Sequence, residues 1–169
     1  PGFSKVIIGE DRVKNWKDYI DVIADSIAAN GGRACVNASA VWTPSHGKEI
    51  AQALSEKLAK IKARPWDDPN AEVSAFANPD IPDRISGMID NLLKTPGATD
   101  VTEQVRGTPR LVKEGRCGWL LPAIILCESH DHPLANKEFL FPYASVVECP
   151  QSDMLKLIGP TLVATAITE

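Results

Sequence analysis

The sequence lacks the features that mark membrane proteins and nucleic-acid-binding proteins. Its longest apolar run, residues 119–127, is too short to cross a bilayer and is interrupted by Pro122. Lysine and arginine form no dense stripe, and the formal net charge is −4, which argues against a nucleic-acid-binding surface. We therefore predict a cytoplasmic protein that has neither a membrane nor a nucleic acid among its partners.

Paired metal ligands and phosphate-binding glycine motifs are also missing. The four cysteines are widely spaced without a CxxC pair, and we expect His130 and His132 to lie in a solvated turn, so no metal site is predicted. Neither GxGxxG nor GxxxxGK[ST] occurs, which argues against a self-contained nucleotide site. A chain of 169 residues can bury a large core without disulfides, so we expect reduced thiols.

A helix followed by a strand is predicted in the first quarter of the chain. Between residues 16 and 30, apolar side chains recur every three or four positions, as in an amphipathic helix. Asn30, Gly31 and Gly32 should end this helix, because glycine adopts left-handed backbone without a Cβ clash. Residues 36–42 then mostly alternate between apolar and polar, which predicts a strand.

The rest of the sequence continues to alternate helices with strands. We expect helices at 46–62, 83–94 and 151–158, and strands at 5–8, 119–127, 143–148 and 162–167. Residues 63–82 and 98–116 should be mainly loops, since prolines and polar residues dominate them. This alternation indicates an α/β fold with parallel crossovers, and the length fits one domain.

Cys35 lies where the predicted helix gives way to the predicted strand. A thiol on so short a crossover can be held by two rigid elements while it faces a cleft, as a nucleophile requires. The alternative is that Cys35 is a small buried apolar residue, which is the usual state of a free cysteine. The residues alone assign no catalytic histidine to it.

Three segments of the chain together resemble the catalytic domain of the aldehyde dehydrogenase superfamily. GRAC at 32–35 is similar to the family's Gly-Gln-x-Cys around its nucleophile, and GWLLPAI at 118–124 to its strand ending in Pro-Thr-Ile. EFLFPY at 138–143 is similar to Glu-x-Phe-Gly-Pro-Val, and RPWDDP at 64–69 falls where the family has a Gly-x-Pro-x-Asp-Pro turn. The resemblance implies an open, mostly parallel sheet with helices on both faces.

The resemblance also implies a mechanism and a role for two residues. Cys35 would attack an aldehyde to form a thiohemiacetal, and hydride transfer to NAD or NADP would leave a thioester. The backbone N–H of Cys35 and an asparagine side chain would hold the oxyanion. Glu138 would hydrogen-bond the nicotinamide ribose; without the resemblance it would be read as a surface carboxylate. Water would release a carboxylic acid, or coenzyme A would accept the acyl group in the acylating branch.

The chain departs from the family pattern at Arg33, Leu140 and Phe141, and it begins at Pro1 without a methionine. The resemblance implies that the NAD(P)-binding domain, the oxyanion asparagine and the water-activating glutamate belong before residue 1. We therefore expect residues 1–169 to be a single thiol-bearing catalytic domain, inactive alone, from a longer chain that forms a homo-oligomer. The alternatives are a coenzyme A-acylating aldehyde dehydrogenase and a non-catalytic homologue that serves only in assembly.

Overall fold

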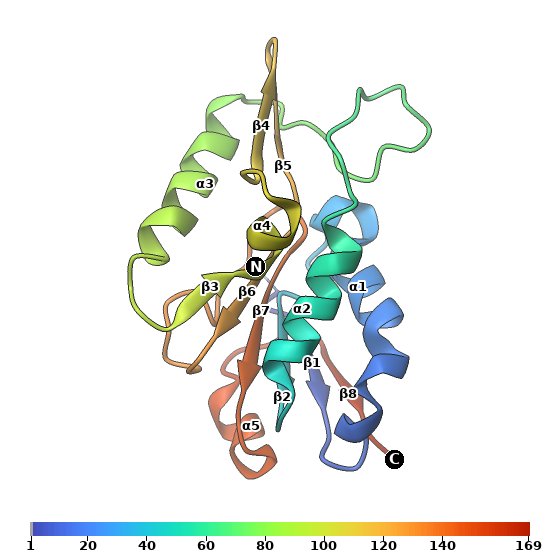
Figure 1. Ribbon diagram of the computed structural model, residues 1–169, viewed down its shortest axis with the longest axis vertical. Coiled ribbons are helices and arrows are strands. Elements are labelled where there is room, and N and C mark those ends of the chain that lie inside the picture. The colour runs from blue at the N-terminus through green and yellow to red at the C-terminus, as the bar shows by residue number, and fades with distance from the viewer. Residues whose placement is uncertain (1) are drawn as a thin grey trace.

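A six-stranded, mostly parallel sheet organises the protein in the computed structural model, which describes residues 2–169 (Figure 1). Pro1 lies outside the described residues. The strand order is β3 (Ala98–Asp100), β6 (Ala123–Cys127), β7 (Tyr143–Glu148), β2 (Ala40–Thr43), β1 (Lys5–Ile8) and β8 (Ala164–Ile167). All neighbouring strands are parallel except β3 and β6. The predicted α/β fold with a mostly parallel sheet is confirmed.

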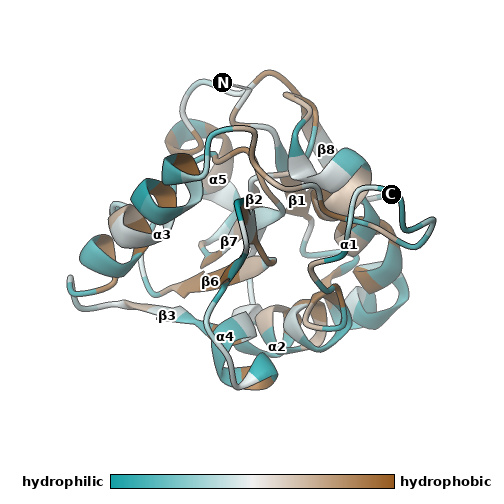
Figure 2. Cartoon of the chain, turned by 90° about the horizontal axis from the view of Figure 1, so that it is seen from above, coloured by the Kyte–Doolittle hydropathy of each residue, from teal (hydrophilic) through white to brown (hydrophobic). Residues whose placement is uncertain are grey.

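Helices cover both faces of the sheet, as Figure 2 shows from above. Along β2, Val41 contributes to one hydrophobic core, whereas Ala40 and Trp42 contribute to the other, because successive side chains of a strand point to opposite faces. The first core includes α1 (Ile20–Ala28), α2 (Gly47–Leu58) and Val101 of α4 (Val101–Arg106); the second includes α3 (Asp80–Leu92) and α5 (Gln151–Leu157). Within residues 2–169, no helix is long and apolar enough to cross a membrane.

The helix expected at 16–30 is three shorter pieces. A 3₁₀ helix spans Val13–Tyr19, α1 follows, and a second 3₁₀ helix spans Ala29–Gly32, where Asn30 and both glycines have positive φ. The strand expected at 36–42 begins only at Ala40, because the preceding residues form a turn. The short helix α4 lies within residues 98–116, which we expected to be mainly loop.

The apolar run at 119–127 is two strands in different sheets, and the prediction of a single strand was wrong. β5 (Cys117–Leu120) pairs with β4 (Leu111–Glu114) in an antiparallel hairpin that projects from the molecule (Figure 1). β6 begins only after Pro122 and lies inside the main sheet. Proline has no N–H for a sheet ladder, and the chain changes sheet at this position.

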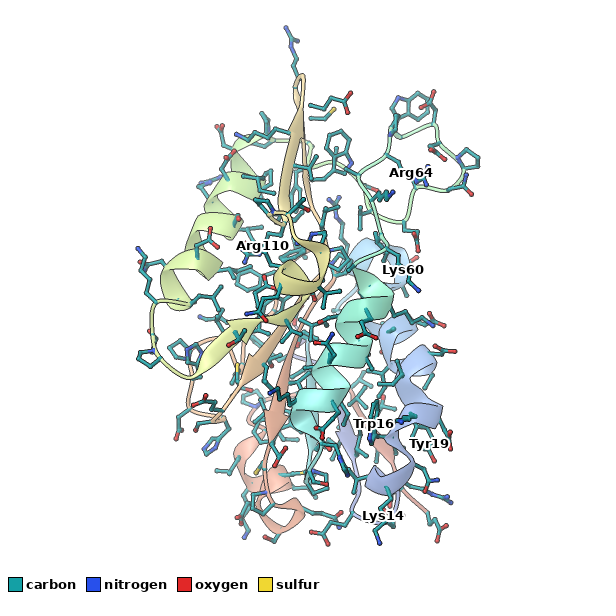
Figure 3. All side chains as sticks on the ribbon, viewed as in Figure 1. Lys14, Trp16, Tyr19, Lys60, Arg64 and Arg110 are labelled. Atoms are coloured by element: carbon teal, nitrogen blue, oxygen red, sulfur yellow. The ribbon has the colours of Figure 1, made fainter. Side chains whose placement is uncertain are left out.

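Arg110 is a buried cation at the base of the hairpin (Figure 3). Its guanidinium donates to Asp100 at 2.7 Å and to Asp90 at 2.5 Å, and Glu103 lies 3.1 Å away. Asp90 is on α3 and Glu103 on α4, so one side chain ties both helices to the hairpin. Only 2% of the Arg110 side chain is exposed, and the Asp100 side chain is nearly as buried at 6%.

We expect Arg110→Met to lower the free energy of unfolding by ~3–5 kcal/mol, because Asp100 would be left as a buried charge without its partner. Lys113→Met is the matched control on the same hairpin: Lys113 pairs with Asp83 at 2.6 Å, but both side chains are largely exposed, so the loss should stay below ~1 kcal/mol. Urea denaturation measures both values. Equal losses in the two variants would show that the buried cluster has no special importance.

Candidate functional site

Cys35 lies in a turn that is anchored to the end of α1. The N–H of Asn37 donates to the carbonyl of Ala34 at 3.0 Å, and its side-chain oxygen accepts from the N–H of Ala34 at 2.8 Å. The side-chain Nδ2 of Asn37 donates to the carbonyls of Ser26 and Ala29 at 2.8 and 3.0 Å. Asn37 was predicted to be a strand residue; its tendency to bond nearby backbone in turns is the signal that could have identified it.

The carbonyl of Cys35 is fixed by residues that precede β1. The hydroxyl of Ser4, a side chain that is only 1% exposed, donates to this oxygen at 2.9 Å. Gly2 packs so closely that a Cβ there would lie 1.9 Å from the same oxygen. Cys35 itself is exposed, and its N–H has no acceptor among residues 2–169. Cys35 is therefore not the buried apolar residue that the alternative interpretation expected.

Glu138 is bound by Phe3, the residue that directly precedes Ser4 in the sequence. Its Oε2 atom accepts a hydrogen bond from the N–H of Phe3, and its Oε1 atom has no hydrogen-bond partner within residues 2–169. The Glu138 side chain is half-buried. Phe3 and Ser4 are consecutive, so two predicted site residues that are far apart in sequence are linked through one short segment.

The three segments that carry the family resemblance pack against one another. Gly32 has φ +69°, and a Cβ there would lie 2.3 Å from the nitrogen of Pro142 and 2.4 Å from the carbonyl carbon of Phe141. The carbonyl of Pro142 in turn accepts from the N–H of Ala123 at 2.9 Å. The cysteine turn, the start of β6 and the segment that follows Glu138 thus form one structural unit.

Arg33 makes its contacts with the loop at residues 74–76. Its guanidinium donates to the carbonyl of Ser74 at 2.8 Å and lies 4.5 Å from the ring centre of Phe76. The N–H of Phe76 donates to the carbonyl of Gly118 at 2.9 Å. Arg33 therefore connects the cysteine turn, through the loop at 74–76, to the segment at 118–124. Its guanidinium contacts belong to this loop and not to the thiol of Cys35.

The four thiols fall into two classes. Cys35 and Cys117 are exposed, whereas Cys127 and Cys149 are buried. Burial raises the pKa of the Cys127 thiol to about 12. The pKa of Cys149 is also raised, mainly by burial and to a smaller extent by the negative charge of Asp153. The thiolate is the reactive form, so both buried thiols should react slowly at neutral pH.

His132 is a structural residue and is only 7% exposed, so the solvated position expected for it was wrong. Its Nδ1 accepts from the N–H of Leu134 at 3.1 Å, and its Nε2 lies 3.2 Å from the carbonyl oxygen of Thr95. In the part of the chain that the structure describes, no group of three His, Cys, Asp or Glu side chains is arranged to hold a metal. His132 thus connects two loops.

No protein-family model and no curated protein sequence matches the chain. Many solved structures do match. The NAD⁺ complex of aldehyde dehydrogenase from Bacillus cereus superposes with a TM-score of 0.80 at 18% identity, covering 99% of this chain and 33% of its own. Lactaldehyde dehydrogenase from Escherichia coli gives 0.80 at 16% identity, covering 99% and 35%. Mycobacterium tuberculosis aldehyde dehydrogenase complexed with NAD⁺ gives 0.75 at 20% identity, covering 99% and 34%.

This chain has an aldehyde dehydrogenase fold. It spans about a third of the length of the solved aldehyde dehydrogenases that it matches. The fold implied by the resemblance is confirmed, and the match covers nearly the whole chain.

We expect Gly32→Ala to lower the free energy of unfolding by at least ~2 kcal/mol, because the new Cβ meets the Phe141–Pro142 peptide at a residue with positive φ. Gly87→Ala is the control: no atom lies within 4 Å of a Cβ there, and it is inside α3. That change should stabilise the chain by ~0.5–1 kcal/mol. Chemical denaturation tests both, and a harmless Gly32→Ala would contradict the close packing.

Proposed function

We propose that residues 1–169 are the thiol-bearing catalytic domain of an NAD(P)-dependent aldehyde dehydrogenase. In this proposal the domain that binds most of the cofactor belongs to the rest of a longer, homo-oligomeric chain that works in the cytoplasm. The observation that carries the proposal is the shared anchoring of Cys35 and Glu138: the segment at residues 2–4 binds the peptide carbonyl of one and the carboxylate of the other. The matching fold of the aldehyde dehydrogenases supports it.

Cys35 is the proposed nucleophile. Its exposed thiol adds to the carbonyl carbon of an aldehyde, giving a thiohemiacetal, and after loss of hydride the sulfur carries the acyl group as a thioester. The N–H of Cys35, which has no acceptor within residues 2–169, is free to donate to the oxyanion. The turn closed by Asn37 keeps this N–H and the thiol together on one rigid element.

Glu138 fits the proposed contact with the cofactor. Because Phe3 occupies only Oε2, Oε1 is left as an acceptor for a hydroxyl of the nicotinamide ribose. The chemistry that the nicotinamide ring supplies when bound is acceptance of a hydride. Among residues 2–169, Glu138 is the residue that we assign to the cofactor.

We expect iodoacetamide to alkylate Cys35 about tenfold faster than Cys117 at neutral pH, because a positioned nucleophile is more reactive than an unassisted surface thiol. Peptide mass spectrometry after timed quenching measures each rate. Cys117 is the internal control, since it is also exposed. Equal rates at Cys35 and Cys117 would favour the non-catalytic assembly domain.

We expect residues 1–169 alone to show no NAD(P)-dependent aldehyde oxidation, because these residues supply the thiol and not a complete site for the hydride acceptor. The longer protein should be active and should lose its activity in Cys35→Ala, while Cys117→Ala keeps it. The appearance of reduced nicotinamide measures turnover. Product formed by the 169 residues alone would refute the proposal that a separate domain binds most of the cofactor. A requirement for coenzyme A in the longer protein would assign that protein to the acylating branch.

A further inference from the structure

Lys5 is a buried cation beside the proposed site that the chemistry above does not use. Its side chain, on β1, is 2% exposed. The ammonium donates to the carbonyl of Phe3 at 2.8 Å and to the hydroxyl of Thr161 at 3.1 Å. Burial lowers the pKa of Lys5, and the negative charge of Glu138 acts in the opposite direction. A buried charge lowers the stability of the fold unless hydrogen-bond acceptors compensate for it. The carbonyl of Phe3 and the hydroxyl of Thr161 are the acceptors that surround this ammonium.

Phe3, the main partner of Lys5, has a strained backbone. Its φ is +48°, and the other non-glycine residues with positive φ among residues 2–169 are Asn30 and His46. Asn and His tolerate the left-handed region better than other residues, whereas a bulky aromatic residue there is a true outlier. Such strain persists only where surrounding contacts hold it.

The contacts that hold Phe3 are polar and lie on both sides of it. Its N–H donates to Glu138, and its carbonyl accepts from the ammonium of Lys5. A cavity of about 230 Å³ borders both Phe3 and Lys5, so side-chain packing does not enclose the segment there. We therefore expect Phe3 to relax toward a negative φ when the ammonium is removed.

We propose that Lys5 is a positioning residue for the site formed by Cys35 and Glu138, an inference that rests on the proposed function. The ammonium of Lys5 holds the carbonyl of Phe3, which directs the N–H of Phe3 to Glu138. The same bond fixes the peptide group between Phe3 and Ser4, and the hydroxyl of Ser4 donates to the carbonyl of Cys35. One buried cation thereby sets the position of both the thiol turn and the carboxylate.

The test compares Lys5→Met with the control Lys113→Met on the exposed hairpin. Methionine is unbranched like lysine but one atom shorter, so the change removes the ammonium and keeps most of the apolar stem. Amide hydrogen exchange, resolved by residue, follows Phe3 with Ile7 of β1 as the internal reference. Alkylation by iodoacetamide gives the ratio of the Cys35 rate to the Cys117 rate. Urea denaturation of each variant shows whether the whole fold is affected.

We expect Lys5→Met to speed exchange of the Phe3 amide about tenfold relative to Ile7, and to lower the Cys35 to Cys117 ratio about threefold. Lys113→Met should change neither. If Lys5→Met does not fold, Thr161→Val removes one partner of the ammonium and should shift both readouts in the same direction by smaller factors. A lower unfolding free energy with either readout unchanged would overturn the positioning role.

The outcomes also separate this inference from the proposed function. If Cys35 in the unaltered chain reacts no faster than Cys117, the proposed nucleophile fails whatever Lys5 does. If Cys35 reacts faster, but its advantage over Cys117 and the exchange of Phe3 both survive Lys5→Met, the nucleophile stands and the role of Lys5 fails.

Discussion

The candidate site depends on the way that residues 2–4 cross between Cys35 and Glu138. Gly2 lies against the carbonyl of Cys35, Ser4 donates to that same oxygen, and Phe3 donates to Glu138. The crossing needs a residue without a side chain at position 2 and a left-handed backbone at position 3. Lys5, at the start of β1, connects this crossing to the main sheet through its bond to the carbonyl of Phe3.

The sheet places three separate segments at one location. β1 and β2 are adjacent and parallel, which puts the segment that precedes β1 beside the turn that precedes β2. β7 is the other neighbour of β2, so the segment with Glu138 and Pro142, which leads into β7, arrives at the same edge. Gly32 then allows the cysteine turn to contact the Phe141–Pro142 peptide directly. The parallel arrangement therefore explains why residues that are far apart in sequence meet.

Much of the fold was predictable because hydrophobic periodicity reports which side of an element is buried. The strand β7 and the helices α2, α3 and α5 were predicted with errors only at their ends. The division of residues 119–127 between two sheets was missed, since a continuous apolar run has no period to show where the chain changes partner. Asn37 and Ser4 were missed because their roles come from hydrogen bonds with Ala34 and Cys35 in a folded geometry that the periodic pattern does not encode.

The alternation of helices and strands, the helix stop at Gly31 and Gly32, and the motifs that resemble the aldehyde dehydrogenases can all be read from the amino-acid sequence. These features are local, because each depends on the backbone preference or the spacing of nearby residues. The exposure of Cys35, the binding of Arg33 to the loop at 74–76, and the burial of Lys5 beside Phe3 and Thr161 became visible in the folded chain alone. The exposure of a side chain and its hydrogen-bond partners depend on which distant segments the sheet brings together. The spacing of residues along the chain does not contain this information.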